Sequence, residues 1–486
     1  MVNSVGSSVA AHPGAVLFDI GRGGGRQING KPSYTVEQAA NELTRTGDRW
    51  HDVNGDGVTD VSYQFRKTAS PLFAGYGLRG FSQLNPAAEA QARNAMAAWS
   101  DVAKVRFSEA PPGGAEEGNI AFSNYTTNEG EREGATAITT KLPSEASQQY
   151  LGKNPQMPRF GLVSDVFFDS TDDANREPTP TNGGKKTSLH EVGHALGMSH
   201  PHRDLPQGMS YDTATYAQDT VGYSVMSNWD EHHTGQDFNK NGVKHFPSGP
   251  MVDDIAAIQK LYGANTDARS TDTTYGFNSN ADRDDYRLSH SSDAPVFTIW
   301  DGGGVDTMDF SGFSDQQIIN MNPGQGSSIG GMKGNVFIAK GVTIENAIGG
   351  SGDDVFISNR AQNVMTGNGG KNTFRFLSTK QSTPDRPDRI TDFVSGKDKI
   401  DLSELHRKSA RGDTPSKSTK VQRPVELVPQ FTGKRNQAVL SYDPAIKQAR
   451  LEIDVNGNGN PNFVLLIDSQ SPLKPTDIQV AKPTTT

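Results

Sequence analysis

No cysteine occurs among the 486 residues of the chain. Disulfides are therefore excluded, and stability outside a cell must come from packing and bound metals. No apolar run approaches the roughly 20 residues of a membrane-spanning helix, so no membrane span is expected. A basic start followed by a long apolar core is also missing, so no cleaved Sec leader is recognised. These absences alone are compatible with a cytoplasmic chain.

Basic residues are not in excess either. The net charge is −9 at pH 7 and the isoelectric point is about 5.7, so nucleic acid is not expected as a partner. An acidic balance suits a protein with several calcium sites. Hydrophobic residues make up only 33%, whereas glycine occurs 52 times. This composition predicts many turns and short strands in place of long buried helices.

The most informative stretch present runs from His190 to His200 and reads H-E-x-x-H-x-x-G-x-x-H. His190 and His194 are four residues apart, so a helix places both imidazoles on one face. Glu191 lies beside them. Gly197 can take a positive φ and end the helix, so that the chain turns back and brings His200 to the metal as a third ligand. Three histidines leave one open position on a tetrahedral zinc, the catalytic pattern. The motif is the zinc signature of the metzincin metalloproteases.

A methionine follows in the string Tyr-Ser-Val-Met-Ser-Asn-Trp, residues 223–229. Metzincins place a methionine in a tight turn beneath the zinc, as an apolar floor for the histidine rings. Met226 could be ordinary core, but its position after His200 favours this Met-turn. The predicted reaction is hydrolysis of peptide bonds. Zinc activates a water and polarises the carbonyl, and Glu191 accepts the proton of the water and delivers it to the leaving amine.

Helical and strand patterns alternate through the first 265 residues. Helices are predicted near residues 35–43, 86–105, 187–196 and 252–261, and strands at 61–66 and 119–123. This mixture predicts an α+β fold with a metzincin protease domain at residues 31–265. Residues 1–30 are rich in glycine, serine and alanine, so they are expected to form a flexible leader or propeptide-like segment.

Glycine and aspartate recur after Asn265 between short alternating strands such as Ile318–Met321 and Val336–Ala339. Residues 349–356 fit G-G-x-G-x-D-x-U-x, the calcium-binding β-roll repeat. In a second copy, residues 367–374, two asparagines replace a glycine and the aspartate. Two copies are fewer than a stable solenoid usually needs, and a simple turn is the alternative for each. Residues 266–486 are predicted to form a calcium-binding domain, a parallel β-roll or β-sandwich.

The chain resembles the serralysins, the bacterial metzincins that carry such repeats. The resemblance covers most of the chain and rests on long strings. They are Asn29–Tyr34, the zinc motif with Pro201, Asp253–Gln259, Leu261–Asn265, Tyr275–Asn280, Trp300–Gly304, Gly341–Ile348 and Asp398–Ser403. It implies a secreted, monomeric endopeptidase that acts on proteins with one catalytic zinc and several structural calcium ions. It also implies export by type I secretion machinery, for which Asp477–Val480 is an imperfect C-terminal signal, and a substrate-binding edge strand near residues 134–140.

The resemblance also implies calcium ligands, carried over residue by residue. They are Arg269, Thr271, Thr273, Asp301, Gly303, Gly304, Asp306, Thr343, Glu345, Gly350, Gly352 and Asp354. A further candidate calcium loop is not a usual family feature. It reads D-x-N-x-D-G-x-x-D, and alternating carboxylates around a glycine turn suit calcium; a solvated hairpin turn is the alternative. Its oxygen-bearing residues are Asp52, Asn54, Asp56 and Asp60.

One active-site position departs from the serralysin pattern. Asn228 stands where the family has a tyrosine whose hydroxyl approaches the zinc. An asparagine is too short to reach the metal, so the zinc is expected to keep three protein ligands and water. Water or a neighbour such as His232 could then replace the phenol. The alternative function is an attenuated or inactive zinc-binding homologue that acts as a calcium-dependent binding or adhesion protein.

Overall fold

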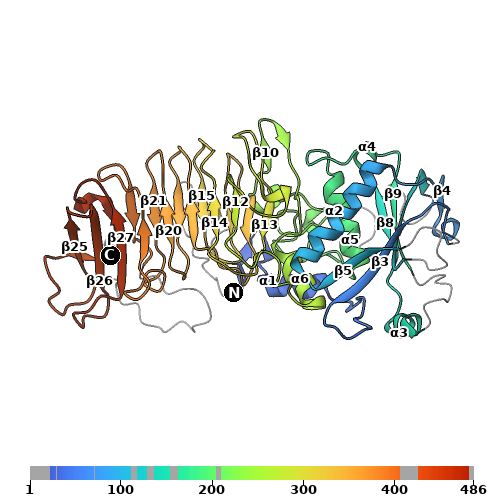
Figure 1. Cartoon of the computed structure of the whole chain (residues 1–486), viewed down its shortest axis with the longest axis horizontal. Coiled ribbons are helices and arrows are strands. Elements are labelled where there is room, and N and C mark those ends of the chain that lie inside the picture. The colour runs from blue at the N-terminus through green and yellow to red at the C-terminus, as the bar shows by residue number, and fades with distance from the viewer. Residues whose placement is uncertain are drawn as a thin grey trace, which may run out of the picture.

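The computed structural model describes residues 22–28, 30–70, 72–110, 118–128, 136–153, 163–203, 210–405 and 425–480. The molecule is elongated, with a module of helices around a sheet at one end and a stack of short strands leading to the other (Figure 1). The N-terminal module holds the candidate zinc residues, and the stack contains the glycine–aspartate repeats. The expected α+β class with a C-terminal β-roll is confirmed.

A five-stranded sheet runs through the N-terminal module in the order β5-β3-β6-β9-β8. Its strands are β3 (Thr59–Phe65), β5 (Val105–Glu109), β6 (Ile120–Tyr125), β8 (Ala137–Thr139) and β9 (Ser164–Asp169). The first four in the sheet order are parallel, whereas β8 runs antiparallel to β9 and forms the edge. All six residues of β6 are buried, as expected for a central parallel strand covered on both faces.

Four helices carry the predicted apolar faces. They are α1 (Val36–Leu43), α2 (Pro86–Val102), α5 (Gly184–Ala195) and α6 (Val252–Tyr262), beside the shorter α3 (Glu145–Lys153) and α4 (Asp173–Arg176). Thr35 caps α1 in a capping box with Gln38, and Asn85 caps α2 ahead of Pro86. The helix predicted to run to residue 105 ends at Val102, because the next residues enter β5. The zinc helix begins three residues earlier than predicted.

The C-terminal half is built from two parallel ladders. One runs β12 (Thr274–Gly276), β14 (Thr307–Asp309), β18 (Asn346–Ile348), β20 (Val364–Thr366), β22 (Asp388–Ile390) and β27 (Phe463–Asp468), and the other runs β15 (Ile318–Asn320), β19 (Val355–Ile357), β21 (Thr373–Arg375), β23 (Lys399–Asp401) and β28 (Ile478–Gln479). Antiparallel β25 (Gln437–Asp443) and β26 (Gln448–Asp454) close the far end beside β24 (Glu426–Leu427). The roll therefore extends well beyond the two recognisable repeats.

The remaining strands are short. They are β1 (Gln27–Ile28), β2 (Lys31–Pro32), β4 (Leu78–Arg79), β7 (Thr127–Asn128), β10 (Asn239–Lys240), β11 (Val243–Lys244), β13 (Phe297–Ile299), β16 (Gly326–Ser327) and β17 (Val336–Ile338). Arg22, just before β1, makes a buried ion pair with Asp253 at the start of α6, at 2.7 Å. Part of the segment 1–30 thus lies in folded structure, and residues 1–21 lie outside the described ranges. Within those ranges, no helix is long and apolar enough to cross a membrane.

Candidate metal centre

Helix α5 holds His190 and His194 and is fixed from behind by α2. The indole Nε1 of Trp99 donates a hydrogen bond to the carbonyl of Leu189 at 3.1 Å. A Cβ added at Gly193 would lie 2.4 Å from Met226 Sδ and 3.2 Å from Trp99 Cζ2. Only a glycine lets the helix approach this closely. Met226 itself is fully buried.

The chain turns sharply after α5 to bring back the third histidine. Gly197 has a φ of 93°, as the sequence indicates, and a Cβ there would lie 2.0 Å from the carbonyl oxygen of Asp48. The returning segment is held from α1, because Ser199 N–H donates to the Leu43 carbonyl at 2.8 Å. Arg45 donates to the carbonyls of His200 and His202. The end of α1 therefore positions the third ligand.

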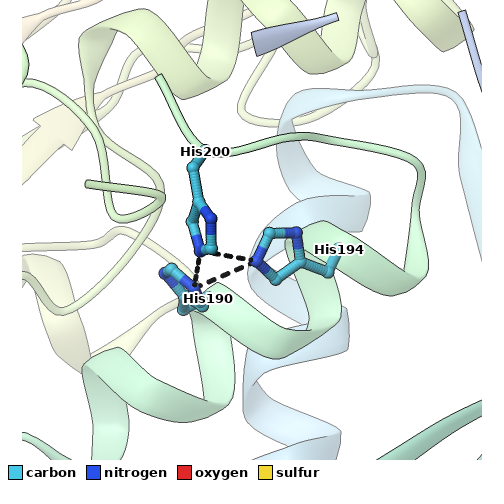
Figure 2. A group of neighbouring side chains, drawn as sticks. All are labelled: His190, His194 and His200. Atoms are coloured by element: carbon cyan, nitrogen blue, oxygen red, sulfur yellow. Dashed lines mark hydrogen bonds between the residues drawn. The ribbon is translucent and has the colours of Figure 1, made fainter. Parts of the chain in front are cut away.

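The three imidazoles converge on one point (Figure 2). Each Nε2 lies 3.1 Å from the other two. His190 Nδ1 is 2.8 Å from the Val225 carbonyl, and His194 Nδ1 is 2.8 Å from the Met198 carbonyl. A carbonyl only accepts, so both Nδ1 atoms carry the proton and both Nε2 atoms present lone pairs. Lone pairs that face one another at this distance repel unless a proton or a cation lies between them, so the three rings could hold a metal ion.

The donor set fits zinc. Three nitrogens at 2.0–2.1 Å from a tetrahedral zinc would lie about 3.3 Å apart, close to the arrangement here. Burial lowers the pKa of His190 and of His200 well below the usual value, and Lys186 and the neighbouring histidines add to the effect. Both rings are therefore kept in the neutral form that binds metal.

Glu191 lies beside the histidines and is buried. Its Oε1 is 4.0 Å from His190 Nε2, and its Oε2 accepts a hydrogen bond from Thr139 Oγ1 at 2.6 Å. Thr139 is the last residue of edge strand β8, so the sheet edge orients the carboxylate. Lys186, one helical turn before His190, donates to the Ser227 carbonyl at 3.2 Å. Burial lowers the pKa of this amine to about 8.

The turn around Met226 is fixed by α6. Asp254 Oδ2 accepts the N–H of Val225 at 2.7 Å, and its Oδ1 accepts the hydroxyl of Ser224 at 2.6 Å. Burial raises the pKa of this carboxyl to about 7, although these hydrogen bonds act to lower it. The carbonyl of Val225 is thereby held where His190 donates to it.

Comparisons with known proteins agree with this geometry. The family described as Matrixin matches residues 81–221, and the one described as Peptidase M10 serralysin C terminal matches residues 264–480. Metalloprotease AprA of Pseudomonas entomophila (strain L48) is 45% identical, over 94% of this chain and 92% of that protein. Metallopeptidase AprA of Pseudomonas marginalis is 42% identical, over 94% and 93%. Serralysin C of Dickeya chrysanthemi is 38% identical, over 92% and 91%.

The chain belongs to the serralysin family. It is accordingly a metalloendopeptidase of the metzincin class, as the zinc motif predicts, and the family implies a zinc cofactor and protein substrates. The family match extends through the β-roll to residue 480.

The calcium positions predicted from the serralysin resemblance lie just before β12 and in the turns that lead into β14, β18 and β19. Asp306 Oδ1 accepts the N–H of Thr273 at 2.8 Å, and Glu345 Oε2 accepts the N–H of Asp306 at 2.8 Å. Asp301 is also near, so burial and the neighbouring carboxylates raise the pKa of Asp306 to about 7. Its Oδ2 is buried and has no hydrogen-bond partner among the described residues. Glycine permits a close approach here, since a Cβ at Gly304 would lie 2.8 Å from the Thr271 carbonyl oxygen.

The other predicted calcium positions also lie in turns where carboxylates accept backbone N–H groups or glycines permit a close approach. Arg269 has a φ of 50°, Gly303 N–H donates to Asp301 at 2.6 Å, and Thr343 is exposed in the turn before β18. Gly350 N–H donates to Asp354 at 2.7 Å. A Cβ at Gly350 or Gly352 would lie 2.0 or 2.4 Å from a carbonyl oxygen of the preceding coil. By side chains alone, the described residues offer no metal-type cluster besides the three histidines, so backbone carbonyls would complete these sites.

The extra loop at residues 52–60 folds as a tight turn before β3. Asp52 accepts the N–H groups of Gly55 and Gly57, at 2.7 and 2.8 Å. Arg106 on β5 pairs with Asp56 at 2.9 Å and with Asp60 at 2.6 Å. The guanidinium thus takes two of the carboxylates expected to face a calcium ion, and the calcium loop stays a prediction.

Asn228 is exposed at the edge of the metal centre. Its Nδ2 lies 3.5 Å from Nε2 of His202, whose ring stacks on His200 with centroids 5.0 Å apart. His232, the neighbour named from the sequence, has a side chain 63% exposed, and its ring is tilted by 36° against that of His233. Thr139 lies in the substrate-binding strand predicted from the sequence, but its contact with Glu191 was not predicted. Sequence reasoning missed Lys186 and His202. Only His202 gave a signal, as a fourth histidine two residues after the motif.

Proposed function

We propose that the chain hydrolyses peptide bonds with one zinc held by His190, His194 and His200 and with Glu191 as the general base. The observation that carries this proposal is the convergence of three Nε2 atoms beside a buried carboxylate. A zinc ion bound there would lower the pKa of a water towards about 7 and polarise the scissile carbonyl.

Glu191 has two proton-transfer tasks. Its carboxylate accepts a proton from the attacking water and then delivers it to the nitrogen of the leaving amine. Thr139 donates to Oε2 at 2.6 Å and orients the carboxylate. Oε1 lies 4.0 Å from His190 Nε2, on the side of the histidines where the water would be bound. Met226 contributes packing beneath the histidines and takes no part in proton transfer.

The substrate strand is proposed to lie along β8. This strand is an edge of the sheet, and its last residue, Thr139, touches Glu191. An extended peptide paired with β8 would bring its backbone past the metal centre. Of the stretch predicted at 134–140, residues 134 and 135 lie outside the described ranges.

Calcium is proposed to bind in the turns of the roll as a structural ion. Carboxylates are crowded around Asp306, and the Oδ2 atom of Asp306 has no hydrogen-bond partner among the described residues. Glycines in these turns let backbone carbonyl oxygens approach closely. Oxygen atoms gathered in this way suit a hard cation such as calcium. We also retain 31–265 and 266–486 as the protease and calcium-binding domains. Kinship with the serralysins and the absence of cysteine support secretion of a monomer by type I machinery, and action outside the cell.

Calcium is expected to raise the melting temperature of the C-terminal half. A ligand at about 100 times its Kd stabilises the folded state by about 2.7 kcal/mol per site. For a domain of this size that is a shift of about 5–10 °C. Scanning calorimetry of the full chain measures it, with magnesium as the control cation. An unchanged profile over millimolar calcium would contradict the proposal, and a smaller increment in Asp306→Ala than in Asp52→Ala would locate the site.

The proposed function is tested by metal content and activity together. We expect one zinc per chain in the wild type and its loss in His194→Ala. Cleavage of casein should stop when 1,10-phenanthroline removes zinc and return when zinc is added. Asn228 favours a second candidate, an inactive zinc-binding homologue that serves as a calcium-dependent binding protein. A zinc-loaded protein that gives no clearing on a casein zymogram would support that alternative.

A further inference from the structure

Lys186 places an amine beside the metal centre without a carboxylate to pair with it. The residue lies in the first turn of α5 and is half-buried, and its Nζ donates to the carbonyl of Ser227 at 3.2 Å. It forms no ion pair with any residue of the described ranges, whereas its neighbour Lys185 pairs with Asp285. One hydrogen bond leaves the other N–H groups of the amine available to a ligand.

The carboxylates around Lys186 are already engaged by other groups. Those whose charge reaches it are Glu191, Asp254 and Asp230. Glu191 accepts from the edge strand β8, Asp254 accepts from the Met-turn, and Asp230 pairs with Lys244 at 2.7 Å. The first turn of α5 holds no acidic residue either. The described part of the fold therefore supplies no close acidic partner for this amine.

We propose that Lys186 is a specificity-determining residue, whose amine binds the carboxylate of an acidic substrate side chain next to the scissile bond. The inference rests on the proposed function and adds to it a class of substrate. It is carried by the place of the amine beside His190 and Glu191 and by the lack of an acidic partner within the described ranges.

The spacing along α5 determines which part of a substrate can reach the amine. Lys186 and His190 are one turn apart on the same face of the helix, a rise of about 6 Å. The charge of Lys186 acts on both His190 and His200, so the amine lies on the side of α5 that faces the metal centre. With the scissile carbonyl at the metal centre, the side chain of a flanking glutamate is long enough to span one helical turn.

A purely structural role for Lys186 would be to hold the Met-turn through Ser227. Glutamine in place of Lys186 could still donate to the Ser227 carbonyl but carries no charge, whereas arginine keeps a charged donor. Loss of the structural role alone would change the hydrolysis of all peptides alike. Recognition of a carboxylate instead affects the ratio between an acidic peptide and its neutral isostere.

The test measures kcat/KM for matched quenched peptides that carry glutamate or glutamine directly before or directly after the scissile bond. We expect the wild type to prefer the glutamate peptide of at least one pair by about tenfold, because a hydrogen bond to a charged group contributes more than a neutral one. Lys186→Gln should reduce this preference to less than about twofold, and Lys186→Arg should retain most of it. The control is Lys104→Gln, at an exposed lysine, which should keep the wild-type ratio. An unchanged ratio in Lys186→Gln, or a wild type without this preference, would overturn the proposal.

Binding of uncleaved peptides separates this inference from the proposed function. Zinc-loaded Glu191→Gln should hold peptides without rapid cleavage, and fluorescence polarisation measures their affinity. The glutamate peptide should bind about tenfold more tightly than its glutamine counterpart, and Lys186→Gln in this background should remove the difference. Equal affinities for the two peptides in a protein that is an active peptidase would overturn this inference alone. The expected preference in a wild type that cleaves no peptide would count against the proposed function alone.

Discussion

Replacing Glu191 by glutamine is expected to lower kcat for a peptide substrate by about 10²–10⁴-fold while leaving one zinc per chain. Glutamine has the shape of glutamate and can still accept from Thr139, whose hydroxyl lies 2.6 Å from Oε2. It cannot take a proton from the attacking water at neutral pH. Because Glu191 is not a ligand in the proposed site, the metal should remain bound. The loss is therefore expected in turnover and not in zinc content.

The measurement is initial-rate hydrolysis of a quenched fluorescent peptide, with zinc determined on the same samples. Glu426→Gln is the matched control, because Glu426 is exposed on β24. This strand pairs with β25, which lies at the end of the molecule opposite the helices (Figure 1). The control variant should keep wild-type turnover. Wild-type kcat in Glu191→Gln would show that another group is the base. Loss of zinc in that variant would show that the carboxylate supports the metal site itself.

The zinc site could be predicted from the sequence because the residues that form it lie close together in the chain. His190 and His194 share a helix face by spacing alone, and Gly197 must turn the chain within one residue. The groups that orient these ligands come from distant parts of the chain. Thr139 lies on an edge strand and Arg45 follows α1, and no local pattern connects either with the motif. Their roles depend on tertiary packing, which a single sequence does not display.

The β-roll, too, could be predicted only in part from the sequence. The glycine–aspartate motif marks two turns, but the ladders continue through strands that carry no motif. A weaker signal was available: Ala347, Phe356, Met365 and Phe374 recur every nine residues and are all fully buried. Each lies at the centre of a three-residue strand. The nine-residue spacing therefore marks successive strands of the roll, which alternate between its two ladders. The interior side chain is required in every coil, whereas the calcium-binding turn is not.

Removing the guanidinium of Arg22 is expected to destabilise the N-terminal module by about 3–5 kcal/mol. Arg22→Met leaves the fully buried Asp253 without its partner, 2.7 Å away in the wild type. It also removes the cation that lies 4.8 Å above the ring of Tyr223, the residue that opens the Met-turn string. Three of the four tryptophans, Trp50, Trp99 and Trp229, lie in the N-terminal module, and the indole N–H of the fourth, Trp300, donates to the carbonyl of Asn265 at its boundary. Tryptophan fluorescence during urea unfolding therefore reports on this half of the molecule.

The sign of the pH dependence follows from Asp253. Burial raises the pKa of this carboxyl, and the Arg22 guanidinium opposes the rise. In Arg22→Met the folded-state pKa should rise further, so the folded protein binds a proton that the unfolded chain has released. Stability is then retained at low pH and lost as pH rises through the folded-state pKa. The destabilisation by Arg22→Met should thus be greater at pH 8 than at pH 5.

Two further variants distinguish an unpaired buried charge from a simple loss of packing. Arg22→Met combined with Asp253→Leu removes both charges, and an apolar pair in place of a buried ion pair is often neutral in stability. The double variant should therefore recover most of the loss. Arg106→Met removes the cation of two exposed ion pairs, with 54% of the arginine side chain exposed, and should leave the urea midpoint close to that of the wild type because solvent screens such pairs. If Arg22→Met unfolds at the wild-type urea concentration, Arg22 does not anchor the N-terminal segment to α6. If the double variant is as unstable as the single one, packing of the arginine stem, and not the charge, provides that anchor.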